Sequence, residues 1–419
     1  MCGIAGSYDL KGRAGHQDPA AVRQMIQSLR HRGPDEEGYW QEGPAVFGHC
    51  RLNVIDLEGG KQPMTGDAAT LSFNGEIYNF LEIRERLLKK RKHFRTRSDT
   101  ESLLRLYEDI GIACASELEG MFAFSVYDRK LQKLYLAVDK FGKKPLYYAL
   151  KDGVFIFASE LKALLTHPLV NKDIDQKSLS QYLFYEYVPA PRTILKDIYK
   201  MEAGTYLEIS TTGIQKHIYH RHDFSSSPIE EGHAVSEFLD VFKGAVARRL
   251  ISDVPLGVFL SGGLDSSAVL AMVKEIEPSR RVKTFTIAFD EPSFDESRYA
   301  AEVSRLFDTE AIVEKCSVKE MLTEHQVLLS ALDEPLADAS YIPTSLLCRL
   351  ARKHVTVALS GDGGDEIFAG YPTFHAHSLS LGLQGLPPAF WKVFQKIIRH
   401  LPVSTANMSP DFLLKQFVK

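Results

Sequence analysis

The sequence lacks the features of membrane-bound and exported proteins. Across 419 residues, no apolar run reaches the roughly 20 residues that a membrane-spanning helix needs. The first residues show no basic segment followed by an apolar one, so we expect no signal peptide. The formal net charge of -4 disfavours a general affinity for nucleic acid or anionic membranes. We therefore expect a cytoplasmic protein with no nucleic-acid or membrane partner.

Cysteine is scarce, and no two cysteines have the short spacing of a metal site. Their number is odd and they are scattered, so no disulfide framework is expected and a reducing cytosol fits. The five are Cys2, Cys50, Cys114, Cys316 and Cys348.

Two common nucleotide-binding patterns are also missing. There is no Gly-x-x-x-x-Gly-Lys-Ser/Thr loop of the standard triphosphatases and no Gly-x-Gly-x-x-Gly fingerprint of dinucleotide-binding folds. Internal repeats and low-complexity tracts are absent as well. Any nucleotide chemistry must therefore use a different loop.

The length fits two or three domains. Up to about residue 210, short apolar runs separated by polar turns predict a β-rich unit with antiparallel sheets. The expected strands lie at residues 45–49, 70–73, 121–127, 133–138 and 154–158, and the expected helices at 19–29, 80–92 and 100–110. A polar, turn-rich stretch at residues 223–228 predicts the linker.

After the linker, strands and helices alternate, which predicts a parallel sheet with helices on its faces. The pattern gives a helix at residues 230–250, a strand at 256–260, a helix at 266–275 and strands at 284–289 and 355–359.

One basic run, at residues 84–97, interrupts the acidic balance. Phe80, Ile83, Leu87 and Leu88 supply an apolar stripe beside it, so we predict that the run is the solvated face of a helix. A nucleic-acid patch is the less favoured alternative.

Cys2 becomes the N-terminal residue once Met1 is removed. A free α-amino group has a pKa of about 8 and a thiol one of about 8.5, so the amine can take the thiol proton. The resulting thiolate is poised to attack an amide. The alternative is an ordinary buried cysteine at the start of a strand, because residues 3–8 are apolar and β-compatible.

A Ser/Gly-rich loop at residues 260–267 (LSGGLDSS) lies between a predicted buried strand and a helix. Open α/β sheets bind ligands at such positions. Gly262 and Gly263 let the backbone approach an anion, and hydroxyl and backbone N–H groups can hold phosphate oxygens. Asp265 would repel phosphate unless a cation is shared, which implies Mg²⁺. A plain helix cap is the alternative.

A second loop of this kind, at residues 359–366 (LSGDGGDE), follows the last predicted strand. It offers small residues together with Asp362, Asp365 and Glu366. The alternative is an acidic surface turn, but two such loops in one sheet favour a shared nucleotide site.

Four short segments resemble the glutaminase domain of class II glutamine amidotransferases. They are residues 2–6 (CGIAG), 30–35 (RHRGPD), 73–79 (FNGEIYN) and 98–101 (SDTE). The loop at residues 261–266 resembles the pyrophosphate loop of ATP pyrophosphatases. In this order, with residues 360–366 downstream, the chain resembles the glutamine-hydrolysing asparagine synthetase family over essentially its whole length.

The resemblance implies an α+β fold at residues 2–210, an αββα sandwich of the N-terminal nucleophile type. An α/β parallel-sheet ATP pyrophosphatase domain would follow at residues 230–419. This second domain would be truncated at its C-terminus, because the chain ends at Lys419, before the usual end of the family.

For the first domain, the resemblance implies that Cys2 attacks the side-chain amide of glutamine. The Asn74 side chain and the Gly75 N–H would form an oxyanion hole, in which each donor typically contributes about 3 kcal/mol. The implied glutamine-binding residues are Arg51, Asn74, Gly75, Glu76 and Asp99. Arg51 would pair with the substrate carboxylate, and the two acids would hold the substrate's amino group.

Each of these residues also has a plainer interpretation. Asn74 and Gly75 form the commonest hairpin-turn pair. Residues 98–101 fit a helix-capping box, and Arg51 could be a surface arginine.

For the second domain, the resemblance implies ATP binding by Leu260, Ser261, Gly262, Gly263, Asp265, Ser266, Ile287, Ser360 and Gly361. Asp265 and Asp365 would bind Mg²⁺-pyrophosphate, and Asp362 lies where the family has an acid important for the adenylate. The aspartate carboxylate would attack ATP to give β-aspartyl-AMP, and ammonia would arrive through an interior channel and displace AMP.

Two other functions stay open. A related amidotransferase would adenylate another carboxylate, because the phosphate loops do not contact the acceptor. A truncated chain would be a glutaminase or binding subunit only. A homodimer is plausible by analogy.

Overall fold

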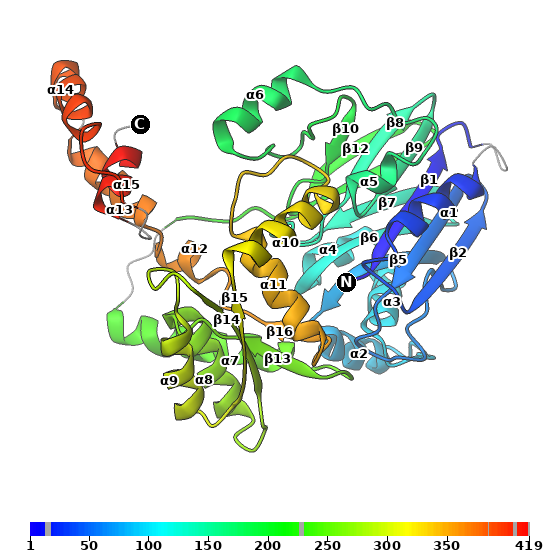
Figure 1. The fold of residues 1–419 in the computed structure, drawn as a ribbon. Coiled ribbons are helices and arrows are strands. Elements are labelled where there is room, and N and C mark those ends of the chain that lie inside the picture. Colours follow the sequence, from blue (N-terminus) through cyan, green and yellow to red (C-terminus); the bar gives the residue numbers. More distant parts are fainter. Residues whose placement is uncertain (13–17, 226–229, 384, 405–408, 418–419) are drawn as a thin grey trace. The chain divides into compact units, whose positions relative to one another are not determined.

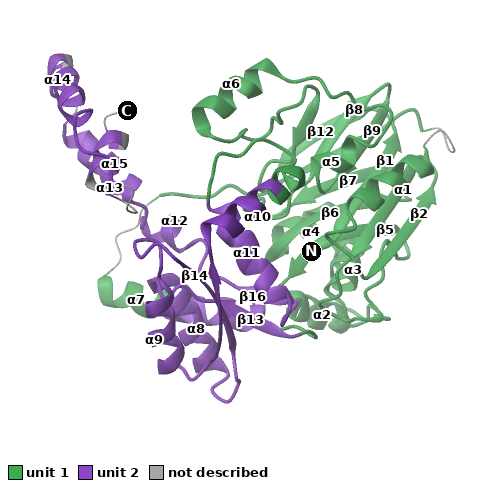
Figure 2. Cartoon of the chain, in the orientation of Figure 1, with its two compact units in different colours: residues 1–238, 251–254, 327–339 green, residues 239–250, 255–326, 340–419 purple. Residues whose placement is uncertain are grey.

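The computed structural model describes residues 1–12, 18–225, 230–383, 385–404 and 409–417. The chain forms two compact units (Figure 2). The first comprises Met1–Phe238, Ile251–Val254 and Val327–Ala339, and the second Leu239–Leu250, Pro255–Gln326 and Ser340–Lys419. Part of the predicted linker, residues 226–228, lies outside the described residues. No helix within the described ranges is long and apolar enough to cross a membrane.

The first unit contains two six-stranded antiparallel sheets (Figure 1). One has the order β10-β8-β9-β1-β3-β2, with β1 Gly3–Asp9, β2 Glu36–Glu42, β3 Ala45–Arg51, β8 Tyr147–Lys151, β9 Val154–Ala158 and β10 Ile198–Lys200. The other has the order β12-β11-β7-β6-β5-β4, with β4 Met64–Thr65, β5 Ala69–Ile77, β6 Gly120–Asp128, β7 Lys133–Val138, β11 Thr205–Ser210 and β12 Gly213–Ile218. The antiparallel strands predicted from the sequence are confirmed.

The alternation of side chains along β6 explains how the layers pack. Phe122 and Phe124 point to one face, into a core shared with helices of the outer layer, whereas Ala123 and Tyr127 point to the other sheet. Successive side chains of a strand face opposite sides, so a strand apolar on both faces must lie between two covering layers. Strand β6 is therefore an interior strand of a multilayer sandwich.

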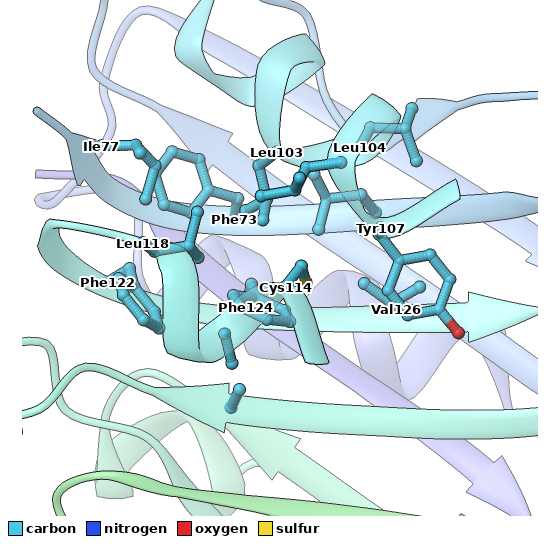
Figure 3. Packing of buried hydrophobic residues seen from close by; sticks show 14 of the residues in the cluster. Phe73, Ile77, Leu103, Leu104, Tyr107, Cys114, Leu118, Phe122, Phe124 and Val126 are labelled. Carbon is cyan, nitrogen blue, oxygen red and sulfur yellow. The ribbon is translucent and has the colours of Figure 1, made fainter. Parts of the chain in front are cut away.

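Helices cover the outer face of each sheet. Helices α1 (Pro19–Ser28) and α5 (Leu161–Leu164) pack on the first sheet, and α2 (Phe80–Lys89), α3 (Asp99–Ile110) and α4 (Cys114–Glu117) pack on the second. Figure 3 shows Leu103 and Tyr107 of α3 packed with Phe73 and Phe124. The predicted αββα sandwich is confirmed. A 3₁₀ turn (Gly111–Ala113) and helix α6 (Gln176–Tyr185) complete the helices of this unit before residue 225.

The basic run largely follows its prediction. Phe80, Ile83 and Leu87 of α2 are buried, and the basic side chains lie on the outer face. The prediction for Leu88 was wrong, since this residue is 51% exposed. Leu88 lies about 100° around the helix from Leu87 and therefore leaves the buried stripe.

A buried carboxylate shapes the loop after β7. Asp139 is fully buried and accepts backbone hydrogen bonds from Phe122, Phe141, Lys143 and Lys144 at 3.0–3.1 Å. A carboxylate that accepts several N–H groups fixes backbone that would otherwise be unsatisfied in the core.

The second unit contains a four-stranded sheet of order β15-β14-β13-β16, in which every pair is parallel. Val258, Leu260, Leu270 and Val273 form its main core, so the predicted α/β architecture is confirmed. The elements are α7 Glu231–Arg249, β13 Leu256–Phe259, α8 Leu264–Ile276, β14 Lys283–Phe289, α9 Ser297–Leu306, β15 Glu310–Cys316, α10 Val318–Ala331, α11 Tyr341–Arg352, β16 Val357–Leu359, α12 Gly364–Phe368, α13 Pro372–Gly382, α14 Pro388–Ile398 and α15 Pro410–Phe417. Helices α7 and α10 each run through a boundary between the units.

We expect Asp139→Asn to destabilise the first unit by about 2–3 kcal/mol, because an amide can replace only one of the two acceptor oxygens and loses the charge. Urea unfolding in a Trp391→Phe background measures this, since Trp40 is then the one tryptophan left. Asp152→Asn, in an exposed turn, is the matched control and should change stability by less than about 0.5 kcal/mol. Equal stability of the two variants would contradict the role of Asp139.

Candidate functional site

Cys2 lies just before β1, beside the end of β3. The register pairs Gly3 with Cys50, which brings Cys2 next to Arg51 and Leu52. The thiol is free, and its Sγ lies 3.8 Å from the Leu52 carbonyl oxygen. Arg32 Nε donates to the Cys2 carbonyl at 2.8 Å, so the backbone of the cysteine is held in place.

The protein surroundings keep this thiol protonated. Burial raises the pKa of Cys2, while a backbone hydrogen bond with Leu52 and the nearby N-terminal amine act in the opposite direction. Burial lowers the pKa of the α-amino group of Met1 to about 6. A protonated thiol beside an unprotonated amine is the arrangement in which the amine can serve as base.

One edge of β5 is open where the motif at residues 73–79 lies. Strand β6 pairs along the other edge, while β4 reaches only Leu71 and Thr70. Beyond β4, side chains replace a strand: Gln62 Oε1 accepts from Phe73 N–H at 2.6 Å, and Asp99 Oδ2 accepts from Ile77 N–H at 3.1 Å.

Gly75 sits between these two capped positions. Backbone groups of an antiparallel strand point alternately to its two edges, so the Gly75 N–H points to the same edge as those of Phe73 and Ile77. A Cβ at Gly75 would come within 2.0 Å of the Met121 carbonyl oxygen, so no larger residue fits. The open edge therefore presents a backbone donor at a position that requires glycine.

The side chain of Asn74 is fully buried, and neither its nitrogen nor its oxygen has a partner among the described residues. An unsatisfied buried amide is costly unless a ligand completes it. Residues 74 and 75 lie within β5, so the hairpin-turn interpretation was wrong.

Arg51 is only 4% exposed, so the surface-arginine interpretation was also wrong. Its guanidinium donates to the carbonyl oxygens of Ile55, Asp56 and Leu57 at 2.7–3.2 Å and to Glu36 at 3.1 Å. These bonds fix the loop after β3 and the planar group itself. A substrate carboxylate would have to displace or share the Glu36 contact.

Glu76 and Asp99 form a repelling acidic pair. Burial raises the pKa of Asp99 to about 6, although hydrogen bonds from Ile77 and Thr100 oppose this shift. Burial and the charge of Asp99 raise the pKa of Glu76 well above its usual value, with the cation of Lys144 opposing. A cationic ligand would relieve this repulsion.

The predicted cap at residues 98–101 is present together with the acidic site. Ser98 is the N-cap of α3 and accepts from Glu101 N–H at 3.1 Å. The Glu101 side chain instead accepts from the backbone of Arg95 and Thr96, so the reciprocal half of a capping box does not form.

Two residues of this site were missed from the sequence. His49 Nε2 donates to the Phe73 carbonyl at 3.0 Å, and Gln62 holds the Phe73 N–H. Burial lowers the pKa of His49 to about 4, so the ring is neutral. A cavity of about 270 Å³ adjoins both residues, lined by Glu36, Glu37, His49, Arg51, Lys61 and Gln62. Neither residue belongs to a segment that stood out in the sequence.

In the second unit, the first Ser/Gly loop joins β13 to α8. Ser261 Oγ lies 3.0 Å from Ser266 Oγ and accepts from Gly263 N–H at 3.1 Å. Gly262 has φ +84°, and a Cβ there would come within 2.4 Å of the Ala300 nitrogen. Ile287, on β14, lies beyond the pair Phe259 and Phe285, near the same ends of the strands.

The second Ser/Gly loop lies beside the first, as predicted. Strands β13 and β16 pair in parallel, so the two loops leave the same edge of the sheet. A Cβ at Gly361 would meet the Ser266 nitrogen at 2.7 Å, and one at Gly364 would meet the Asp265 carboxylate at 2.3 Å. Ser360 donates to Asp362 at 2.9 Å.

Two carboxylates of these loops, Asp265 and Asp365, could hold a magnesium ion whose shell a nucleotide would complete. Asp265 packs against Gly364, the residue before Asp365. Within the described ranges, no group of three or more His, Cys, Asp or Glu side chains could hold a metal. Mg²⁺ commonly takes one or two carboxylates and completes its shell with water and phosphate oxygens. Asp265 and Asp365 would supply the two carboxylates of such a coordination shell.

Both parts of the chain are similar to known protein families. Residues 1–220 match the family described as "Glutamine amidotransferase domain", and residues 237–417 match the family described as "Asparagine synthase". Among solved structures, the chain is similar to glutamine phosphoribosylpyrophosphate amidotransferase from B. subtilis, with a TM-score of 0.40 and 16% identity over 74% of this chain and 65% of that chain.

Two curated relatives cover nearly the whole chain. Asparagine synthetase [glutamine-hydrolyzing] 1 of Bacillus subtilis is 37% identical over 96% of this chain, which spans 64% of that relative's length. Putative asparagine synthetase [glutamine-hydrolyzing] 2 of Methanocaldococcus jannaschii is 33% identical over 94% of this chain and 80% of its own length. The chain belongs to the family of glutamine-hydrolysing asparagine synthetases.

Proposed function

We propose that this chain hydrolyses glutamine at Cys2 and uses the ammonia to convert aspartate into asparagine, with ATP split into AMP and pyrophosphate. The open edge of β5 is the observation that carries the first half. It presents the Gly75 N–H next to the unpartnered Asn74 amide, and the Cys2 thiol is close enough to Glu76 of the same strand for their charges to interact. These are a nucleophile and two oxyanion donors, the parts that acyl transfer requires.

The first reaction starts after Met1 is removed. The α-amino group of Cys2 takes the thiol proton, and Sγ attacks the side-chain carbonyl carbon of glutamine. The oxyanion is held by Asn74 and Gly75, ammonia leaves with the proton, and water hydrolyses the thioester to glutamate. Arg51 binds the substrate carboxylate, and Glu76 with Asp99 binds its ammonium group.

The second reaction uses the two loops at the carboxyl ends of β13 and β16. ATP phosphates lie against the backbone and hydroxyls of residues 260–266, with Ile287, Ser360 and Gly361 completing the nucleotide contacts. Asp265 and Asp365 would hold Mg²⁺, which would offset the charge of the pyrophosphate. The aspartate β-carboxylate attacks the α-phosphorus and pyrophosphate leaves, and ammonia then attacks the carbonyl carbon of the β-aspartyl-AMP and AMP leaves. Asp362 acts beside the adenylate.

We further propose domain limits of residues 2–210 and 230–419, a cytoplasmic location that keeps Cys2 reduced, and a homodimer by family analogy.

The purified chain, with Met1 removal checked by mass, should release glutamate, pyrophosphate and asparagine together from glutamine, ATP, Mg²⁺ and aspartate. Cys2→Ala should lower glutamine-dependent asparagine formation by at least about 10³-fold and leave ammonium-dependent synthesis intact, because only the nucleophile is lost. Cys348→Ala, at an exposed free thiol, is the control. Glutamate without pyrophosphate would favour a glutaminase alone, and pyrophosphate release that needs another carboxylate would favour a different acceptor.

The KM for glutamine should rise about tenfold from pH 7 to pH 5. The pKa of Asp99 is raised to about 6, so the carboxylate is charged above that pH and loses its attraction for the substrate ammonium as the pH falls through it. Asp99→Asn should show the raised KM at both pH values, while exposed Asp173→Asn should follow the wild type. A wild-type pH dependence in Asp99→Asn would exclude this role.

Asp265→Asn should lower aspartate-dependent exchange of pyrophosphate into ATP by about 10²-fold, since a neutral amide is a poor Mg²⁺ ligand. Glutamine hydrolysis should be unchanged, because the loop takes no part in it. Asp308→Asn, an exposed position with φ +46°, is the matched control. Unchanged exchange in Asp265→Asn would remove Asp265 from the metal site.

A further inference from the structure

Lys144 is a buried cation beside the nucleophile, and the mechanism above gives it no role. The residue is 5% exposed, which is unusual for lysine because an ammonium group is costly to remove from water. Its Nζ contacts Met1 Sδ at 2.7 Å, and Arg32 lies 4.0 Å from the same sulfur. In the described part of the chain, no carboxylate lies within ion-pair distance of Lys144. A thioether is a weak acceptor, so packing alone does not explain the charge.

The ammonium group is placed by a rigid loop. The Lys144 backbone N–H donates to Asp139 at 3.1 Å, and that buried carboxylate also holds Phe122, Phe141 and Lys143. The lysine stem is therefore anchored, and its direction toward the chain terminus is set by the fold.

Four charged or ionisable groups surround Lys144, namely Arg32, Glu76, Asp139 and Cys2. Burial lowers the pKa of Lys144 to about 8, and Arg32 acts in the same direction, while Glu76, Asp139 and Cys2 oppose the shift. Lys144 and Arg32 in turn lower the pKa of the N-terminal amine, whereas Cys2 and Glu76 raise it. Removal of Met1 takes away the thioether that Lys144 and Arg32 contact, and the new terminal amine is that of Cys2, whose carbonyl oxygen accepts from Arg32.

We propose that Lys144 is a positioning residue of the glutaminase reaction, whose buried ammonium keeps the terminal amine of Cys2 unprotonated and stabilises the Cys2 thiolate. The inference rests on the proposed function of Cys2. A positive charge a few ångströms from an amine disfavours a second positive charge, and the same charge attracts a thiolate. Both effects favour the reactive state near neutral pH.

The test is the pH profile of kcat/KM for glutamine hydrolysis between pH 5.5 and 9.5 in Lys144→Met. We expect its acidic limb to move up by about one pH unit, which gives about a tenfold loss below pH 7 and recovery near pH 9. Lys144→Arg keeps the charge and should keep the wild-type limb. Lys143→Met, an exposed neighbour on the same loop, is the matched control and should change nothing.

Alkylation of Cys2 by iodoacetamide against pH gives a second reading that needs no turnover. The midpoint of the alkylation rate against pH should shift upward in Lys144→Met. This shift does not require the wild type to hydrolyse glutamine. The assay therefore distinguishes failure of the proposed function from failure of this inference. If Trp40 fluorescence shows that Lys144→Met is unfolded, Lys144→Gln serves as the second variant. An equal loss at every pH, or unshifted profiles in both assays, would overturn the inference.

Discussion

The unpaired edge of β5 is the constraint on which the first site depends. A strand edge normally needs another strand, because buried backbone groups must be satisfied. Here individual side chains bind the backbone of this edge: Gln62 and His49 bind Phe73, and Asp99 binds the Ile77 N–H. The backbone of Gly75, between Phe73 and Ile77, therefore stays available to a ligand. A continuous partner strand would satisfy the same edge but would consume the Gly75 N–H. The short β4 is therefore part of what makes the site possible.

Three ionisable groups near Cys2, namely Glu76, Asp99 and Lys144, form no ion pair within the described residues. Glu76 and Asp99 repel one another, and burial raises the pKa of each. Arg51 donates hydrogen bonds to three carbonyl oxygens and to Glu36. Lys144 contacts the thioether sulfur of Met1. A buried charge without a close partner is unfavourable for stability, so such groups mark places where a substrate completes the balance.

Much of the fold was readable from the sequence because its signals are local. Alternating apolar runs predicted the antiparallel strands, and the strand–loop–helix pattern predicted that residues 260–267 and 359–366 leave one sheet edge. The contacts of His49 and Gln62 could not be predicted, since they join a strand residue and a loop residue to the backbone of Phe73 on a third segment. The sequence also could not decide whether Asn74 and Gly75 form a turn, because the pair suits both a turn and an open strand edge. In the structure, both residues pair with β6 and therefore lie in a strand.

The two Ser/Gly loops of the second unit can pack closely because glycines of one loop lie against residues of the other. A Cβ at Gly361 would strike the start of α8, and one at Gly364 would strike the Asp265 carboxylate. Each glycine is thus fixed by a residue of the opposite loop rather than by its own turn. An anion site built from backbone N–H groups needs this close approach, since its donors have a fixed reach. The orientation of the Asp265 carboxylate is therefore fixed by its packing on Gly364, a residue of the other loop.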